Sequence, residues 1–136
     1  MSDEQNNEFI GVTSDELHKE GNYIKMTLDD KWFDLFKSEN KNWEIRVYDE
    51  KRRKISLFDT IEFENKLTGE FVHRKVVGLI YFESLKDAYY SFSDYDLIGM
   101  FPGICHHIDH WLNIYGSIPG YIEKSDKYGV LAIKLK

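Results

Sequence analysis

The sequence predicts an α+β domain built on a small, mostly antiparallel β-barrel with inserted helices. Segments in which apolar and polar residues alternate, as in strands, dominate the beginning and the end of the chain, and segments with helical spacing lie between them. Gly78 interrupts a long predicted strand, where a glycine permits the bend that a barrel corner needs. The length of 136 residues suits one such domain.

Residues 1–22 are predicted to be an N-terminal extension and residues 23–136 the folded domain. The first ten residues lack the basic start and the apolar run of a signal peptide. The segment from Thr13 to Glu16 has the form of a capping box, and Gly21 is suited to close a short helix after it. We therefore expect the extension to pack on the outside of the domain or to fray.

The spacing of apolar residues predicts the elements of the domain. Before Ser38, four apolar side chains recur at helical spacing, and Asp29 or Asp30 can cap the helix that they indicate. The elements expected are a strand at 23–26, a helix from 29 or 30 to 38, strands at 43–48, 59–64 and 70–82, a helix at 84–91, a helical face made by Ile104, Ile108, Trp111 and Tyr115, a turn at 121–126 and a strand at 130–135.

The strand expected at 43–48 carries the densest chemistry. Its odd-numbered residues are apolar and predict a face in the core, whereas its even-numbered residues are an acid, a base and a phenol. Glu44 and Arg46 would project from the same face with their Cα atoms about 7 Å apart. Their side chains can therefore meet each other or contact one ligand.

Charge narrows the classes of function. The net charge of −6 argues against a protein that coats nucleic acid through bulk charge. The stretch 41–54 is an exception, because its six basic and three acidic residues give a local charge of +3 and leave −9 on the rest of the chain. Such a cationic island attracts a small anionic ligand. The alternative is a solvated turn with scattered ion pairs.

Cysteine usage and hydropathy predict the compartment. Cys105 is the only cysteine, so a disulfide within the chain is excluded, and we expect a reduced, cytoplasmic setting. No apolar stretch approaches the roughly 18 to 20 residues needed to cross a bilayer, so no membrane partner is predicted.

A series of motifs follows the predicted first helix: K-x-x-E-x-R on a strand, then Y-D-x-K-R, then a strand that starts at an aspartate, and a closing Lys127–Tyr128–Gly129–Val130 before the last strand. This order resembles ASCH domains of the PUA-like superfamily over about residues 23–136. The matching residues are Lys41, Glu44, Arg46, Tyr48, Asp49, Lys51, Arg52 and Asp59. The resemblance implies a PUA-like β-barrel with a cleft along the K-x-x-E-x-R strand.

The resemblance also implies binding of RNA or of a modified nucleotide or nucleoside in that cleft, which is our first prediction. The guanidinium of Arg46 suits phosphate, and Glu44 can accept a hydrogen bond from the exocyclic amine of a base. Tyr48, or Trp43 if it is exposed, can stack on a base. The candidate ligand-binding residues are Lys41, Glu44, Arg46, Tyr48, Arg52 and Arg53. No cofactor and no metal are predicted.

A second hypothesis is an enzyme. Some bacterial ASCH proteins are amidohydrolases that remove the acetyl group from N(4)-acetylcytidine, and the lysine matching Lys41 belongs to their catalytic set. Here Lys41 would act as the base and Glu44, which stands where those enzymes have a threonine, would relay the proton. The resemblance implies a further glutamate from the helical region after the long strand. The sequence does not single out its counterpart here, and the acidic residues nearby are Glu83, Asp87, Asp94 and Asp96.

A third hypothesis is a protein-interaction domain with a vestigial cleft. Glu39 and Phe58 stand where the family usually has glycines, and Asn42 and Trp43 replace small or aliphatic residues. Because glycines serve tight turns, the loops at Glu39 and Phe58 are predicted to take other geometries.

Two further clusters of residues are alternative candidate sites. On a helix, His106, Asp109 and His110 share a face in an H-x-x-D-H pattern near a metalloprotease form, but no distant third ligand is evident. We therefore expect a polar helix face, with Cys105 as a small packed residue. The aromatic run 89–95 is predicted to pack in the core, with ligand stacking as the alternative.

Overall fold

The structure is a computed structural model, and it describes residues 10–16, 18–38, 41–92 and 108–136. The strands are β1 (Ile10–Gly11), β2 (Tyr23–Leu28), β3 (Trp43–Val47), β4 (Thr60–Asn65), β5 (Phe71–Phe82) and β6 (Val130–Leu135). The helices are α2 (Asp30–Lys37), α3 (Leu85–Ser91), α5 (Ile108–Gly116) and α6 (Tyr121–Tyr128), with short 3-10 turns at η1 (Ser14–Glu16) and η2 (Arg52–Lys54). None of the described helices is long and apolar enough to span a membrane.

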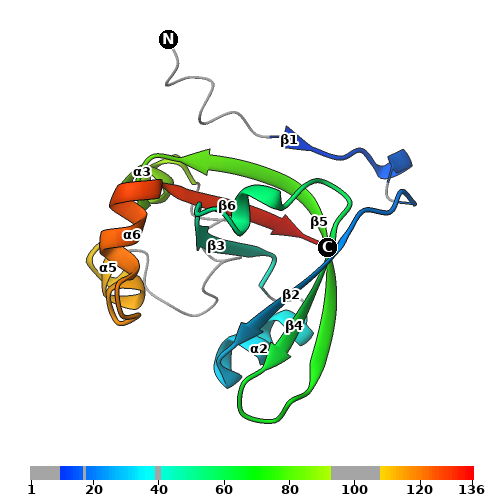
Figure 1. Cartoon of the computed structure of the whole chain (residues 1–136), viewed down its shortest axis with the longest axis horizontal. Helices are drawn as coiled ribbons and strands as arrows, with labels where there is room; N and C mark the ends of the chain where they lie inside the picture. Colours follow the sequence, from blue (N-terminus) through cyan, green and yellow to red (C-terminus); the bar gives the residue numbers. More distant parts are fainter. Residues whose placement is uncertain (1–9, 17, 39–40, 93–107) are drawn as a thin grey trace.

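The strands form a mixed sheet that curls into a half-barrel, in the order β2–β4–β5–β6–β3 with β1 beside β5. The long strand β5 arches over the molecule and pairs with β4 at its beginning and with β6 at its end (Figure 1). Among the described strands, only the β2–β4 pair is parallel. The register of β5 on β6 shifts between Val76 and Gly78, as a bend at Gly78 predicts. The predicted α+β, mostly antiparallel, barrel-like fold is confirmed.

Apolar side chains form two clusters, and the odd-numbered residues of β3 belong to one of them. Trp43, Ile45 and Val47 are buried with residues of α3, α5 and α6, which gather at one end of the sheet (Figure 1). The second cluster joins α2 to β2 and β4, and in it the rings of Phe36 and Phe63 stack at 4.6 Å. Because full burial of such a side chain stabilises a fold by about 1.5–3 kcal/mol, these clusters hold β3 and α2 in place.

The turn before β4 corrects one prediction. Phe58 takes φ 74°, the left-handed conformation that glycine favours, so this loop keeps the geometry that was expected to change. The buried carboxylate of Asp59 then accepts hydrogen bonds from the amides of Asn22 and Ser56, both at 2.8 Å. Glu39, the other replaced glycine, lies outside the described residues.

The extension is only partly as predicted. The carboxylate of Glu16 accepts from the amide of Thr13 at 3.2 Å, which is half of a capping box, but the helix is one 3-10 turn. Gly21 does not close that helix. A Cβ there would lie 2.5 Å from Oδ1 of Asp59, so Gly21 instead allows the two chain segments to approach. Ahead of the turn, β1 pairs with β5, with Ile10 opposite Leu79.

Candidate ligand-binding site

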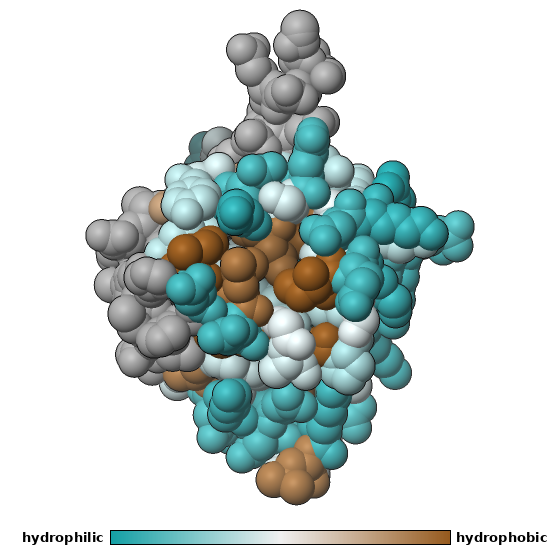
Figure 2. Space-filling view, turned by 90° about the vertical axis from the view of Figure 1, so that its left-hand side faces the viewer, coloured by the Kyte–Doolittle hydropathy of each residue, from teal (hydrophilic) through white to brown (hydrophobic). Residues whose placement is uncertain are grey.

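A cavity of about 390 Å³ lies on the open side of the half-barrel, where the end strands β2 and β3 face each other. Sites for small molecules commonly enclose roughly 300–1,000 Å³. Figure 2 shows a face of the molecule on which apolar surface lies in a hollow rimmed by hydrophilic residues. Nine charged residues line the cavity and give it a net charge of +3: Lys31, Lys41, Arg46, Arg52, Lys66, Lys124, Asp29, Glu44 and Asp49.

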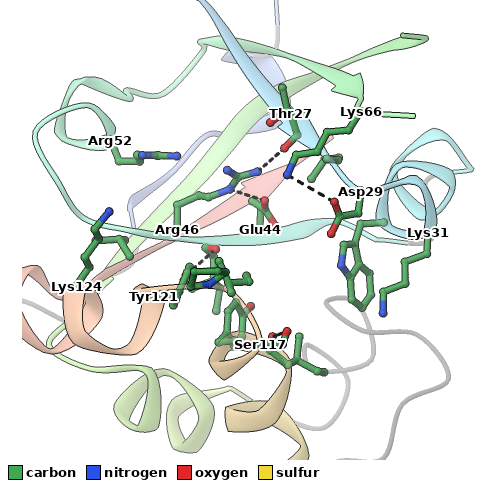
Figure 3. Close-up of a pocket in the computed structure, with 18 of the residues that line it drawn as sticks. Thr27, Asp29, Lys31, Glu44, Arg46, Arg52, Lys66, Ser117, Tyr121 and Lys124 are labelled. Carbon is green, nitrogen blue, oxygen red and sulfur yellow. Dashed lines mark hydrogen bonds and ion pairs between the residues drawn. The ribbon is translucent and has the colours of Figure 1, made fainter. Parts of the chain in front are cut away.

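A largely buried ion pair occupies the middle of the cavity. Nε of Arg46 donates to Oε2 of Glu44 at 2.7 Å, and Glu44 is 8% exposed. Of the two arrangements that the sequence allowed, the structure shows the side chains in contact with each other. Nη2 of Arg46 also donates to the carbonyl of Thr27 at 3.1 Å, so this side chain connects β3 to β2 across the open side (Figure 3).

Lys41 lies beneath this pair and is 2% exposed. Its Nζ donates to the carbonyl of Trp43 at 2.8 Å and lies 3.9 Å from Oε1 of Glu44. Burial lowers the pKa of Lys41 to about 8, although the carboxylate of Glu44 opposes this shift. An appreciable fraction of Lys41 is therefore a neutral amine near pH 8.

Arg74 on β5 holds the backbone at Lys41 and is not among the site residues that the sequence predicts. Its Nη1 donates to the carbonyls of Phe36 and Lys41 at 3.1 and 3.0 Å, and its Nη2 to the carbonyl of Leu135 at 3.2 Å. In a strand, side chains two residues apart share a face, so Arg74 lies on the face of the buried Val76. Its place on the buried face of the strand is the sequence feature that indicates a buried arginine.

Two tyrosines close the side of the cavity that the helices form. The hydroxyl of Tyr121 donates to the carbonyl of Ile45 at 3.0 Å, which ties α6 to β3. The rings of Tyr115 and Tyr121 lie 5.0 Å apart. Burial raises the pKa of both phenols well above the ordinary value, so both remain neutral hydrogen-bond donors at physiological pH.

The family model of the ASCH domain matches residues 26–136. The chain belongs to the ASCH domain family. The solved structure of the hypothetical protein PH0355 is 31% identical, with a TM-score of 0.71, and the match covers 84% of this chain and 97% of that one. Protein PF0455 from Pyrococcus furiosus is 30% identical, with a TM-score of 0.63, covering 84% of this chain and 96% of that one. No curated protein matches the chain.

In this ASCH domain, the charged side chains around the Glu44–Arg46 pair differ in whether they form ion pairs. Nη1 of Arg52 donates to Oδ2 of Asp49 at 2.9 Å, and Nζ of Lys66 lies 3.5 Å from Oδ1 of Asp29. Lys31 and Lys124 form no ion pair with any described residue; Nζ of Lys31 instead lies 4.6 Å from the ring centre of Trp32. The local sequence gave no signal that Lys31, Lys66 and Lys124 would converge on β3.

Some predicted site residues lie elsewhere. Tyr48 and Arg53 contact each other, with the guanidinium carbon 4.5 Å from the ring centre, and neither lines the cavity. Trp43 is buried and so is not exposed for stacking. Glu83 and Asp87 are exposed and do not line the cavity, whose acids are Asp29, Glu44 and Asp49. Asp94 and Asp96 lie outside the described residues.

The competing clusters are only partly described. Cys105, His106 and the side chain of His110 lie outside the described residues, and the part that is described holds no group of three potential metal ligands. In the aromatic run, Tyr89 packs against Trp111 with ring centres 5.6 Å apart. The described members of that run do not line the cavity.

Proposed function

We propose that this ASCH domain binds RNA or a modified nucleotide or nucleoside in the cavity beside β3. The observation that carries the proposal is a cavity of net charge +3, built around the buried Glu44–Arg46 pair, in a protein of net charge −6. A cationic recess in an acidic surface attracts a small anion while the remaining surface repels nucleic acid in bulk.

The lining offers each kind of contact that a nucleotide needs. The carboxylate of Glu44 can accept a hydrogen bond from an exocyclic amine while Arg46 holds it in position. The rings of Trp32 and Tyr115 line the cavity and provide aromatic surface for a base. The lysines at the margin supply charge for phosphate.

The test is a titration with nucleosides, nucleotides and short single-stranded RNAs at low and at high salt. We expect binding at low salt and a loss of about tenfold or more in affinity for Glu44→Gln, since the substitution removes a charged acceptor. Glu64→Gln on β4 makes the same change outside the cavity and serves as the control. Absence of binding to all of these ligands at low salt would refute the proposal.

A second candidate function, hydrolysis of an N-acylated cytidine or a related amide, is favoured by the environment of Lys41. Neutral Lys41 would take a proton from water as the water oxygen attacks the acyl carbonyl. The carbon–nitrogen bond would then break, and Glu44 would relay the proton to the departing amine. The products would be the free amine and the carboxylic acid.

Mass spectrometry after incubation with N(4)-acetylcytidine tests this reaction. We expect cytidine and acetate to form, with a rate that rises with pH through about 8 as Lys41 loses its proton. Lys41→Ala should lower turnover by at least a hundredfold, in the range of general-base catalysis. Lys54→Ala, outside the cavity, should not. Turnover unchanged by Lys41→Ala would remove Lys41 from the mechanism.

A further inference from the structure

The cations of the cavity lie at two separate ends. In Figure 3, Arg52 and Lys124 lie on one side of the Glu44–Arg46 pair, and Lys31 and Lys66 lie on the other. The two ends differ in whether their cations already interact with other groups of the protein.

At the Lys66 end, the charges have partners that the protein itself supplies. Lys66 pairs with Asp29, both side chains are more than half exposed, and Lys31 lies over the ring of Trp32. Exposed pairs of this kind hold their geometry weakly.

At the Arg52 end, the guanidinium of Arg52 is held in position but keeps one donor without an acceptor. The amide and Nη1 of Arg52 both donate to the carboxylate of Asp49, at 3.1 and 2.9 Å, which sets the orientation of the guanidinium. Nε of Arg52 is nevertheless buried and has no hydrogen-bond acceptor among the described residues. A buried donor without an acceptor is destabilising, so this position favours a ligand that brings an oxygen atom.

Lys124 adds a second cation to the same end. It follows Tyr121 by three residues on α6, so the two side chains lie on the same face of the helix. Arg52 and Tyr121 both line the cavity. Lys124 is exposed, lines the cavity and forms no ion pair with any described residue.

We infer that the ligand of this cavity carries a phosphate group, and that Lys124 and the guanidinium of Arg52 bind that phosphate. The inference rests on the proposed function, in which Glu44, held in position by Arg46, contacts the base. A nucleoside monophosphate or a nucleotide of an RNA chain meets this description, whereas a free nucleoside uses only half of the site.

The experiment measures the affinity for matched ligands by calorimetry: cytidine, N(4)-acetylcytidine, and the 3′- and 5′-monophosphates of each. We expect at least one monophosphate to bind about tenfold more tightly than its nucleoside at low salt, in line with a charge-assisted hydrogen bond. Lys124→Gln should abolish this gain and leave the affinity for the nucleoside within about twofold. Lys127→Gln, the same change on the same helix outside the cavity, should preserve the gain.

Three results would overturn the inference, and they differ in whether they also refute the proposed function. If nucleoside and monophosphates bind equally, the phosphate contact is wrong and the proposed function stands. If Lys31→Gln removes the gain and Lys124→Gln does not, the phosphate lies at the other end. If neither nucleoside nor monophosphate binds, the proposed function fails as well. Circular dichroism melts of each variant establish that it is folded.

Discussion

Lys41 shows how one buried residue acquires unusual chemistry. Burial of its amine and the neighbouring cations Arg46 and Arg74 disfavour a positive charge. The carboxylate of Glu44 and the nearby aromatic rings favour it, but they do not offset the burial. Between pH 8 and 10.5 the folded protein therefore releases a proton that the unfolded chain still holds. In this window the contribution of Lys41 makes the folded state more stable as the pH rises.

The titration of Lys41 can be measured directly. We expect its side-chain carbon signal, followed by NMR across the pH range, to have a midpoint at about 8. In Glu44→Gln the midpoint should fall further, because the negative charge of the Glu44 carboxylate, which favours the protonated amine, is lost. A midpoint above 10 in the native protein would contradict the buried geometry.

Phe58 gives a second prediction. Because φ is 74° at this residue, Phe58→Gly should have a free energy of unfolding about 1 kcal/mol larger than Phe58→Ala, although both lose the ring. At the neighbouring Leu57, which is not among the residues with positive φ, alanine should be the more stable of the two. Chemical denaturation of the four variants tests both orders, and the same order at both positions would count against strain at Phe58.

At the scale of elements, the site depends on three contacts between segments that are far apart in the chain. Arg46 connects β3 to β2, Tyr121 connects α6 to β3, and Arg74 connects β5 to the segment before β3. Each contact uses a backbone carbonyl as the acceptor. The walls of the cavity are thus held by main-chain atoms whose positions depend on the fold rather than on residue identity.

The α6–β3 contact can be tested separately. Tyr121→Phe should lower the free energy of unfolding by about 1–3 kcal/mol, because the buried carbonyl of Ile45 loses its donor. Tyr90→Phe makes the same change on a ring that is 67% exposed and should alter stability by less than about 0.5 kcal/mol. Equal effects of the two substitutions, measured by thermal or chemical denaturation, would show that the Tyr121 contact adds no stability.

For the whole molecule, the distribution of charge matters more than its total. The stretch 41–54 carries +3 on a chain whose remainder carries −9, and the cavity concentrates cations from that stretch and from outside it. A small ligand entering the cavity meets the cationic lining. A long duplex must also lie against the acidic remainder of the surface.

This contrast predicts selectivity by size. At about 0.15 M salt we expect a double-stranded RNA of about 20 base pairs to bind at least tenfold more weakly than a mononucleotide that occupies the cavity, as measured by competition. Raising the salt should weaken the mononucleotide modestly, because few charges are involved. Tighter binding of the duplex, with a steep dependence on salt, would mean that another surface binds nucleic acid.

The sequence by itself determined most strands and helices of the domain, because apolar spacing reflects which face of each segment is buried. The alternation in 43–48 indicated both the buried side of β3 and the meeting of Glu44 with Arg46. Only the tertiary structure decided which charges join them. Lys31, Lys66 and Lys124 lie on separate segments, and their convergence depends on the curl of the sheet and on where α6 packs, which local patterns do not encode. For the same reason Tyr48 and Arg53, although close in sequence to the site, lie outside the cavity.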